Sequence, residues 1–355
     1  MGILHEVSTI RFYIYDVFYR ELQLDNSLSE YINDEGKVSM YKIKREIIQN
    51  NIYWVDIEPW AIDIARLRFW LSLVVDEEQP EPLPNFEFKF VCANTLIPLA
   101  EVEEQTQLQL EDTKELNVET LRKYMVEYYN TQKNKEKEDM QGQIKGRIEK
   151  FLWIGKNMSM DLFSTKSERT KQLETYRPFQ KNHSASFFDP SLMMGNSKFD
   201  IVIWNPPYVQ IKDISEKDKE RYKNIFFSSN GRFNLFYFFL ELSGTKLTKQ
   251  NWISSMIIPD RLLLNSQCLN LRQWLLNNQT ILEINSFDTA IFKSAVVDSI
   301  ILLYTNKINH NSKILARSNI WPSDLYNQSK KSIPIDYFKN NPSLQFNLDY
   351  SYEKY

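Results

Sequence analysis

Short apolar runs with the character of β-strands alternate with helical segments along this chain, and this alternation restricts the fold more than any other feature. Strands are predicted at residues 51–57, 86–94, 199–204, 252–259, 281–287 and 299–305. Helices are predicted from Pro59 onward, at 233–242 and at 268–276. Strands alternating with helices predict an α/β fold with a doubly wound, mostly parallel sheet. The last two strands are joined by too few residues for a crossover helix, so we expect them to pair antiparallel at the edge.

The remaining segments define the expected domain organisation. Apolar side chains surround a helix over residues 3–22, which predicts a largely buried helix, whereas 34–50 look like connecting structure. Residues 100–155 are rich in Glu, Gln and Lys and predict an inserted helical arm that is largely exposed to solvent. The expected parts are therefore a first core part (1–99), the arm (100–155), a second core part (156–306) and a further region (307–355).

Composition excludes several classes of protein. The only cysteines are Cys92 and Cys268 and the chain has three histidines, so neither a disulfide framework nor a metal site is expected. No apolar run reaches membrane-spanning length, and a reducing cytoplasm is the expected location. The net charge of −3 argues against a compact basic nucleic-acid module, although it does not exclude DNA binding.

The stretch FDIVIWNPPYVQ, residues 199–210, is the most informative motif. Prolines cannot join a central ladder, so the strand must stop at Asn205. Pro206 and Pro207 each fix a φ angle, and Asn205 is held extended because a proline follows it. In open α/β sheets ligands bind beyond the carboxyl ends of strands. The motif therefore predicts a preorganised site, whereas the simpler alternative is a proline turn with a surface tyrosine.

The side-chain oxygen of Asn205 and the carbonyl of Pro206 provide two acceptors, and the Tyr208 ring provides a flat face. This set suits a planar amino group on an aromatic substrate, such as the exocyclic amine of adenine. That nitrogen is a poor nucleophile because its lone pair is delocalised into the ring. Two acceptors on its N–H groups favour a pyramidal nitrogen, and stacking on Tyr208 contributes roughly 1–3 kcal/mol per base.

With these residues the sequence resembles the N6-adenine DNA methyltransferases of the Asn-Pro-Pro-Tyr class, and most of all the methylase portion of type IIG restriction-modification enzymes. The resemblance rests on IYWVDIEPWAIDIARLRFWLSLVV, FFDPSLM and FDIVIWNPPYVQ, and covers most of residues 3–305 outside the arm. It implies a Rossmann-like fold, S-adenosyl-L-methionine as cofactor, double-stranded DNA as partner, and a place in a restriction-modification system.

The resemblance also implies roles for single residues. Asn205, Pro206, Pro207 and Tyr208 would be catalytic, and Phe292 would pack on the flipped base opposite Tyr208. Asp56 would bind the donor ribose beside Ile57, Asn94 would face the donor adenine, and Asn205 would border the donor. Simpler alternatives remain open, namely a helix cap for Asp56, a plain turn for Asn94 and a core position for Phe292.

The chain departs from the family pattern at both ends. Its eight glycines form no glycine-rich loop between a strand and a helix, so the first central strand and the donor loop of the family are not found. The chain therefore looks truncated, or like one half of a split enzyme whose missing segment a second chain would supply. Donor binding is expected to be weak, because close backbone approach requires glycine. The region 307–355 would be the start of a truncated target-recognition region.

Two other functions remain open from the sequence. The same motif geometry suits the amide of a protein glutamine, which would make the chain a glutamine-N5 methyltransferase. The absent glycine loop favours a non-catalytic remnant that binds DNA or a partner. An associated nuclease and the recognition sequence are not predicted.

Overall fold

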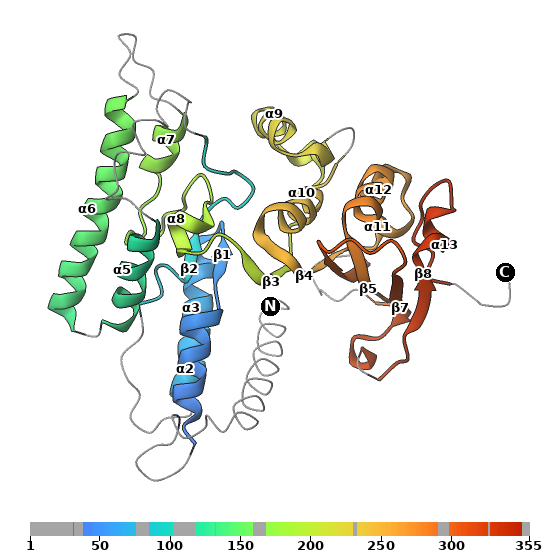
Figure 1. The fold of residues 1–355 in the computed structure, drawn as a ribbon, viewed down its shortest axis with the longest axis horizontal. Helices are drawn as coiled ribbons and strands as arrows, with labels where there is room; N and C mark the ends of the chain where they lie inside the picture. Colours follow the sequence, from blue (N-terminus) through green and yellow to red (C-terminus); the bar gives the residue numbers. More distant parts are fainter. Residues whose placement is uncertain are drawn as a thin grey trace. The chain divides into compact units, whose positions relative to one another are not determined.

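A computed structural model describes residues 31, 38–75, 85–101, 118–131, 133–158, 168–229, 233–289, 298–325 and 327–349 of the chain. By its internal contacts the chain divides into two compact units, the first ending at Ser197 and the second continuing from Lys198 (Figure 1). Each unit has a sheet of its own. The helix predicted at residues 3–22 lies outside the described residues.

The first unit contains a two-stranded parallel sheet of β1 (Trp54–Asp56) and β2 (Phe90–Cys92), in which Asp56 pairs with Cys92. Helix α3 (Pro59–Val74) follows β1 and has its proline in the first turn, where a missing N–H breaks no helical hydrogen bond. It connects the two strands along the chain, as the alternating pattern predicts. The strand predicted at 86–94 is shorter in the structure, where β2 spans Phe90–Cys92.

Helix α2 (Met40–Asn51) corrects the prediction of connecting structure at 34–50. The hydroxyl of Ser39 accepts a hydrogen bond from the backbone N–H of Lys42 and thereby caps the helix. Ile43, Ile47 and Ile48 lie on one helical face and are fully buried. The helix is thus specified by its N-cap and by isoleucines at helical spacing. The polar residues between these isoleucines make the pattern hard to recognise in the sequence.

The described residues of the arm predicted at 100–155 form the helices α5 (Val118–Asn130) and α6 (Asn134–Met158), of which α6 extends slightly beyond it. Their inward faces are buried, contrary to the exposure expected from composition. Tyr129 joins the core around Phe69 and Phe90, and the Asn85 amide donates to the carbonyl of Tyr128 at 2.6 Å. Two short helices, α7 (Glu168–Glu174) and α8 (Pro190–Met194), also belong to the described part of this unit.

The second unit is built on a six-stranded sheet in the order β3-β4-β6-β5-β7-β8. Its strands are β3 (Phe199–Trp204), β4 (Thr248–Pro259), β5 (Thr280–Phe287), β6 (Ser299–Thr305), β7 (Lys313–Ile320) and β8 (Lys331–Pro334). Only the pairs β3–β4 and β5–β7 are parallel, so this sheet is mixed, and the prediction of a mostly parallel sheet is wrong.

Strand β6 explains much of the difference. It lies between β4 and β5 and pairs antiparallel with both. The antiparallel β5–β6 pair was predicted correctly from the short connection between the two strands. The pair was expected at the edge of the sheet, however, and it lies inside it. The outer strands β7 and β8 come from residues 307–355, which show no clear pattern in the sequence. The described strands also form two sheets rather than the single sheet expected.

Helices α10 (Leu235–Leu242) and α12 (Leu269–Asn278) accompany this sheet (Figure 1). The Trp204 ring packs edge-on against Phe239 of α10 at 5.0 Å, and the Tyr304 hydroxyl donates to the carbonyl of Leu240 at 3.0 Å. Helix α9 (Glu216–Ile225) lies between β3 and α10 in the sequence, and α13 (Ile335–Lys339) follows β8.

Arg272 of α12 is fully buried and links two distant segments of the second unit. Its Nη1 donates to the carbonyls of Leu262 and Asn265, at 2.9 and 2.8 Å, in and after the short helix α11 (Arg261–Leu264). Its Nη2 donates to the carbonyl of Ser343 at 3.0 Å. One guanidinium thus joins the segment that follows β4 to residues near the end of the described chain.

Within the described residues, no helix combines the length and the apolarity that a membrane span requires. In the same residues, His, Cys, Asp and Glu side chains do not gather into a group of three or more that could hold a metal ion.

Candidate functional site

The Asn-Pro-Pro-Tyr motif lies at the carboxyl end of β3, where the sequence predicts it. The strand ends at Trp204, so the ladder stops one residue before Asn205. Asn205 and Tyr208 are half-buried, Pro206 is buried and Pro207 is exposed. The motif therefore has one proline packed into the fold and two candidate side chains that are partly open to solvent.

Three contacts hold the motif from outside its own strand. The Tyr208 hydroxyl donates to the carbonyl of Ile257 in β4 at 3.2 Å. The Leu235 N–H donates to the carbonyl of Val209 at 3.0 Å, and the Ile211 N–H donates to the carbonyl of Phe233 at 3.3 Å. The residues before α10 thus form a short antiparallel bridge with the residues after the motif. These contacts connect the motif to β4 and to the segment before α10, which are distant from it in sequence.

Two carboxylates at the same edge of the six-stranded sheet were not singled out from the sequence. Asp260 follows β4, Asp298 precedes the antiparallel β6, and the Asp260 N–H donates to the Asp298 carbonyl at 2.9 Å. Burial raises the pKa of Asp260, and repulsion from Asp298 raises it further. The signal in the sequence was an acid directly after the predicted strand at 252–259, the same kind of signal that identified Asp56.

Of the predicted donor residues, Asp56, Ile57 and Asn94 lie at the carboxyl edge of the two-stranded sheet in the first unit, whereas Asn205 belongs to the second unit. Asp56 is the last residue of β1, and its carbonyl accepts a hydrogen bond from the N–H of Ala93 at 2.9 Å. Asn94 comes directly after Ala93, and Ile57 is 52% exposed. Asp56 and Asn94 are therefore neighbours at one sheet edge, as expected for ends of parallel strands.

Local turns orient both polar side chains. Asp56 Oδ1 accepts from the N–H of Glu58 at 2.9 Å, and Asn94 Oδ1 accepts from the N–H of Leu96 at 3.2 Å. Burial raises the pKa of Asp56, although backbone N–H groups of Glu58 and Ile57 oppose this shift. Helix α3 takes Glu58 as its N-cap, so Asp56 does not cap it directly. Asn94 therefore has the turn role that was its simpler alternative, whereas Asp56 does not have the capping role that was its own. The Asp56 carboxylate accepts one backbone N–H and also has lone pairs left for a ligand.

The FFDPSLM segment has a clear structural role. Asp189 caps α8 by accepting from the N–H of Leu192 at 2.9 Å, and Gly195 ends that helix with a φ of 66°. Ala185 and Phe188 form parallel bridges with Ala93 and Pro98. This segment therefore supports the chain next to Asn94.

The predicted site residues fall into two groups, one in each unit. Asn205, Pro206, Pro207 and Tyr208 belong to the second unit, and Asp56, Ile57 and Asn94 belong to the first. Phe292 lies outside the described residues.

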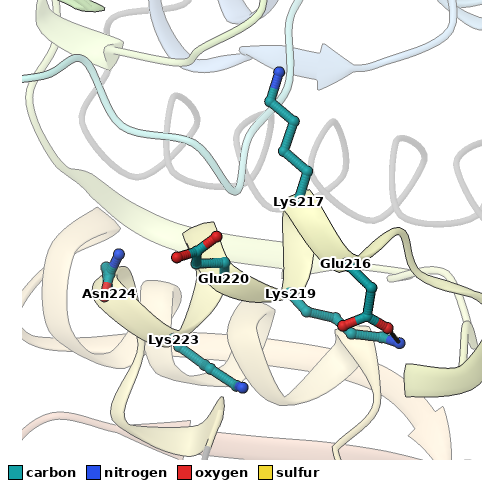
Figure 2. Close-up of a pocket in the computed structure, with 6 residues that line it drawn as sticks. All are labelled: Glu216, Lys217, Lys219, Glu220, Lys223 and Asn224. Atoms are coloured by element: carbon teal, nitrogen blue, oxygen red, sulfur yellow. Dashed lines mark hydrogen bonds and ion pairs between the residues drawn. The ribbon is translucent and has the colours of Figure 1, made fainter.

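A separate hollow of about 690 Å³ lies over α9 and is lined by Glu216, Lys217, Lys219, Glu220, Lys223 and Asn224 (Figure 2). Lys219 pairs with Glu216 at 2.7 Å, one turn away on the same helix. Its lining carries both signs of charge and includes none of the predicted site residues. We interpret it as a solvated helix face rather than as the site.

Comparison with known families identifies the class of the protein. The model of the Eco57I restriction-modification methylase family matches residues 50–292, which is more than half of the chain and contains both groups of candidate residues. The chain belongs to this family. The matched region runs from the last turn of α2 to a point just beyond the end of β5.

Three relatives have similar sequences. RM.MjaORFECS2P of Methanocaldococcus jannaschii, whose name places it among type II restriction enzymes and methyltransferases, is 24% identical across 92% of this chain and 31% of its own length. The type II restriction enzyme and methyltransferase RM.Eco57I of Escherichia coli is 27% identical over 33% of this chain and 12% of its own length. The type II methyltransferase M.BanIII of Aneurinibacillus aneurinilyticus is 29% identical over 34% of this chain and 21% of its own.

Solved structures of restriction-modification enzymes are also similar, at a distance. The type IIL enzyme MmeI in complex with DNA matches 97% of this chain and 41% of its own, with 14% identity and a TM-score of 0.42. The type IIG endonuclease BpuSI matches 42% of this chain and 20% of its own, with 16% identity and a TM-score of 0.33. The chain spans less than a third of the length of the three relatives it matches in sequence.

Proposed function

We propose that this chain transfers a methyl group from S-adenosyl-L-methionine to the N6 nitrogen of adenine in double-stranded DNA. It would do so in the cytoplasm, as the methylase of a restriction-modification system. The observation that carries the proposal is the Asn205–Tyr208 motif at the end of β3, held by β4 and by the residues before α10. The family supports the class of reaction, and the motif supports the choice of an amino group as acceptor.

Asn205 and Pro206 would act on the nucleophile. As the N6 nitrogen becomes tetrahedral, the Asn205 side-chain oxygen and the Pro206 carbonyl accept its two N–H groups and direct the lone pair away from the ring. The new N–CH3 bond forms as the S–CH3 bond of the donor breaks, and one proton then leaves the nitrogen for solvent water. Because the motif is fixed before substrate arrives, these acceptors need no reorganisation during the reaction. Tyr208 would hold the extruded base by stacking.

The residues at the β1–β2 edge fit a donor that carries a ribose. Asp56 is a strand-end carboxylate held in one orientation by the N–H of Glu58, which is the usual type of ribose ligand in dinucleotide folds. Ile57 is exposed beside it and offers an apolar contact. The donor supplies an electrophilic methyl group when it is bound. Asn94 would contribute a hydrogen-bonding group next to the donor adenine.

A further strand, from this chain or from a second one, is part of the proposal. Among the described residues, β3 pairs with β4 alone, and β1 pairs with β2 alone. Within the part of the chain that the structure describes, the second edge of each strand is where a further strand would add by backbone pairing. A strand added there would support the proposed donor site.

The test is methyl transfer by the full chain from labelled donor, at saturating concentration, to unmethylated duplex DNA and to a glutamine-containing peptide. We expect label in the DNA alone, recovered as N6-methyladenine after digestion and mass spectrometry. Asn205→Ala serves as the control for contaminating activity. Label in the peptide, or recovery only as methylated cytosine, would refute the proposed acceptor. Donor and DNA binding without any transfer would favour the non-catalytic alternative.

A further inference from the structure

Tyr53 and Lys89 lie side by side at the amino edge of the two-stranded sheet, at the end opposite the proposed donor residues. Tyr53 precedes β1 and Lys89 precedes β2. The Trp54 N–H donates to the Lys89 carbonyl at 2.7 Å, and the Lys89 N–H closes a turn by donating to the Phe86 carbonyl at 2.9 Å. The Lys89 amine lies 3.7 Å from the centroid of the Tyr53 ring, which is a close cation–π contact. Backbone pairing and side-chain stacking thus hold the amine in one place.

Arg122 brings a second positive charge to this place from helix α5. Burial raises the pKa of the Tyr53 hydroxyl, and the charge of Arg122 opposes that shift. Burial, together with repulsion from Arg122, lowers the pKa of Lys89 to about 7. The guanidinium therefore lies near both the amine and the phenol. Its stem is packed against the end of α8, because a Cβ at Gly195 would meet the Arg122 Cγ at 3.1 Å.

Nearby carboxylates do not balance this pair of cations. Glu87 is the nearest acid to Lys89 in sequence, and it acts on Tyr128 instead. Burial raises the pKa of the Tyr128 hydroxyl, and Glu87, which is hydrogen-bonded to it, raises it further. Among the described residues, Arg122 is the charged group that acts on the pKa of Lys89. Two cations held together in this way cost free energy, and a bound anion would offset that cost.

The three side chains suit a phosphate group. A guanidinium presents two parallel donors that match two phosphate oxygens, and an amine acts as a compact positive charge. The Tyr53 hydroxyl can donate to a third oxygen. A terminal phosphate carries about −1.5 to −2 charges at neutral pH, which matches two cations, whereas a carboxylate has one charge and two oxygens.

We infer that Lys89, Arg122 and Tyr53 form a binding site for a phosphate group at the amino edge of the β1–β2 sheet. Strand β1 separates this site from Ile57 by roughly 10 Å, at about 3.3 Å per residue, so the site is distinct from the proposed donor site. The phosphate can be the terminal group of a small molecule or a diester of the DNA backbone. The inference needs no methyl transfer and does not depend on the proposed function.

Calorimetry with inorganic phosphate and the full chain tests the site, in chloride buffer at constant ionic strength. Arg122→Gln should weaken phosphate binding by roughly 10-fold or more, because it removes a charge-assisted contact. Lys123→Gln is the matched control on the same helix, where Lys123 is also exposed, and it should leave the affinity unchanged. No phosphate binding by the wild type, or equal affinities for the wild type and Arg122→Gln, would overturn the inference.

Duplex DNA separates the two sources of phosphate. If a backbone diester occupies the site, DNA should displace inorganic phosphate, and Arg122→Gln should reduce the salt dependence of DNA affinity by about one phosphate contact. If a terminal phosphate occupies it, adenosine monophosphate should displace inorganic phosphate, and DNA should bind Arg122→Gln and Lys123→Gln equally. Either result supports the site and identifies its ligand.

Amine acetylation of the wild-type chain gives a measurement that no folding defect can affect. Lys89 should react readily with acetic anhydride at neutral pH, because a substantial fraction of its amine is unprotonated. Excess inorganic phosphate should slow this reaction several-fold, since it covers the amine and favours its protonated form. Lys123, measured in the same digest by mass spectrometry, should react at the same rate with and without phosphate. Equal acetylation of Lys89 in phosphate and in chloride would contradict the assignment.

Discussion

The carboxyl ends of β1 and β3 present candidate residues in very different ways. At the end of β3, Tyr208 and the residues after it are fixed by hydrogen bonds to β4 and to the segment before α10. At the end of β1, Asp56 is oriented by the N–H two residues further along the chain, and Asn94 is oriented in the same way at the end of β2.

This difference indicates how each group would contribute. Long-range contacts preorganise the residues at the end of β3. This suits groups that must accept hydrogen bonds from a nitrogen as it becomes tetrahedral in the transition state. Local turns orient Asp56 and Asn94 at the ends of β1 and β2, and this suits residues that bind a ligand without taking part in the bond changes. Substitutions at the first should therefore lower turnover, and substitutions at the second should lower affinity.

The strongest test of the comparison is Asn205→Ala. Loss of one preorganised acceptor should lower the methylation rate by roughly 100-fold or more. Binding to DNA, measured by fluorescence anisotropy at fixed salt, should change little because it rests on phosphate contacts elsewhere. Unchanged turnover in single-turnover assays would remove Asn205 from the reaction.

Tyr208→Ala should give the next largest effect, about 10- to 100-fold in the methylation rate, since base stacking contributes roughly 1–3 kcal/mol. Unlike Asn205→Ala, it should also weaken capture of the extruded base, because a stacking face serves both the bound base and the transition state. A 2-aminopurine at the target position reports base extrusion by its fluorescence. A loss in rate without any loss of extrusion would argue against stacking.

Asp56→Asn should separate affinity from turnover. Loss of a charge-assisted hydrogen bond to ribose should weaken donor binding about 10-fold, which calorimetry can measure, with little change in turnover at saturation. Asn94→Ala provides the comparison at the neighbouring strand end and should have a smaller effect. Equal effects of both variants on turnover alone would contradict a donor role.

The same variant makes a prediction about pH. Because burial raises the pKa of Asp56 above its usual 3.8, the fold favours the protonated carboxyl. The destabilisation due to ionisation is absent below the unfolded pKa and complete above the folded one, so this group lowers stability as pH rises through that window. Asp56→Asn should lack this dependence in urea titrations between pH 3 and 7. A stability curve identical to that of the wild type would show that Asp56 is solvated.

Tyr208→Phe should have the smallest effect. The ring remains, but the hydrogen bond to the Ile257 carbonyl is lost, which costs about 1 kcal/mol of stability. We expect a rate reduced by only a few-fold, together with a small loss in the urea midpoint. A loss as large as that of Tyr208→Ala would show that the hydroxyl, rather than the ring, determines the activity.

Those features that depend on neighbouring residues were predictable from the sequence. The prolines after Trp204 ended β3 where expected, Pro59 began α3, and the apolar runs at 281–287 and 299–305 gave β5 and β6 nearly to the residue. The position of Asp56 and Asn94 at one sheet edge followed from two strand ends in the same way.

Features that depend on distant contacts were missed. The buried side chains of α2 are interrupted by Lys44, which is itself buried because its amine reaches the Ser72 carbonyl. Strand β7 carries Arg317, whose burial depends on ion pairing with Glu283 of β5 at 2.7 Å. The position of β6 between β4 and β5 and the hydrogen bond from Tyr208 to Ile257 also join residues far apart in sequence.

The buried guanidinium of Arg272 has a mechanical consequence. Phe346 is also fully buried, and its N–H donates to the carbonyl of Leu263 at 2.9 Å, so residues 343–346 are bonded to the segment that follows β4. A force applied to the chain beyond Leu348 would therefore be transmitted through these hydrogen bonds to Leu262, Leu263 and Asn265. Any domain or tag fused after that point would pull directly on the edge of the sheet at which Asp260 lies.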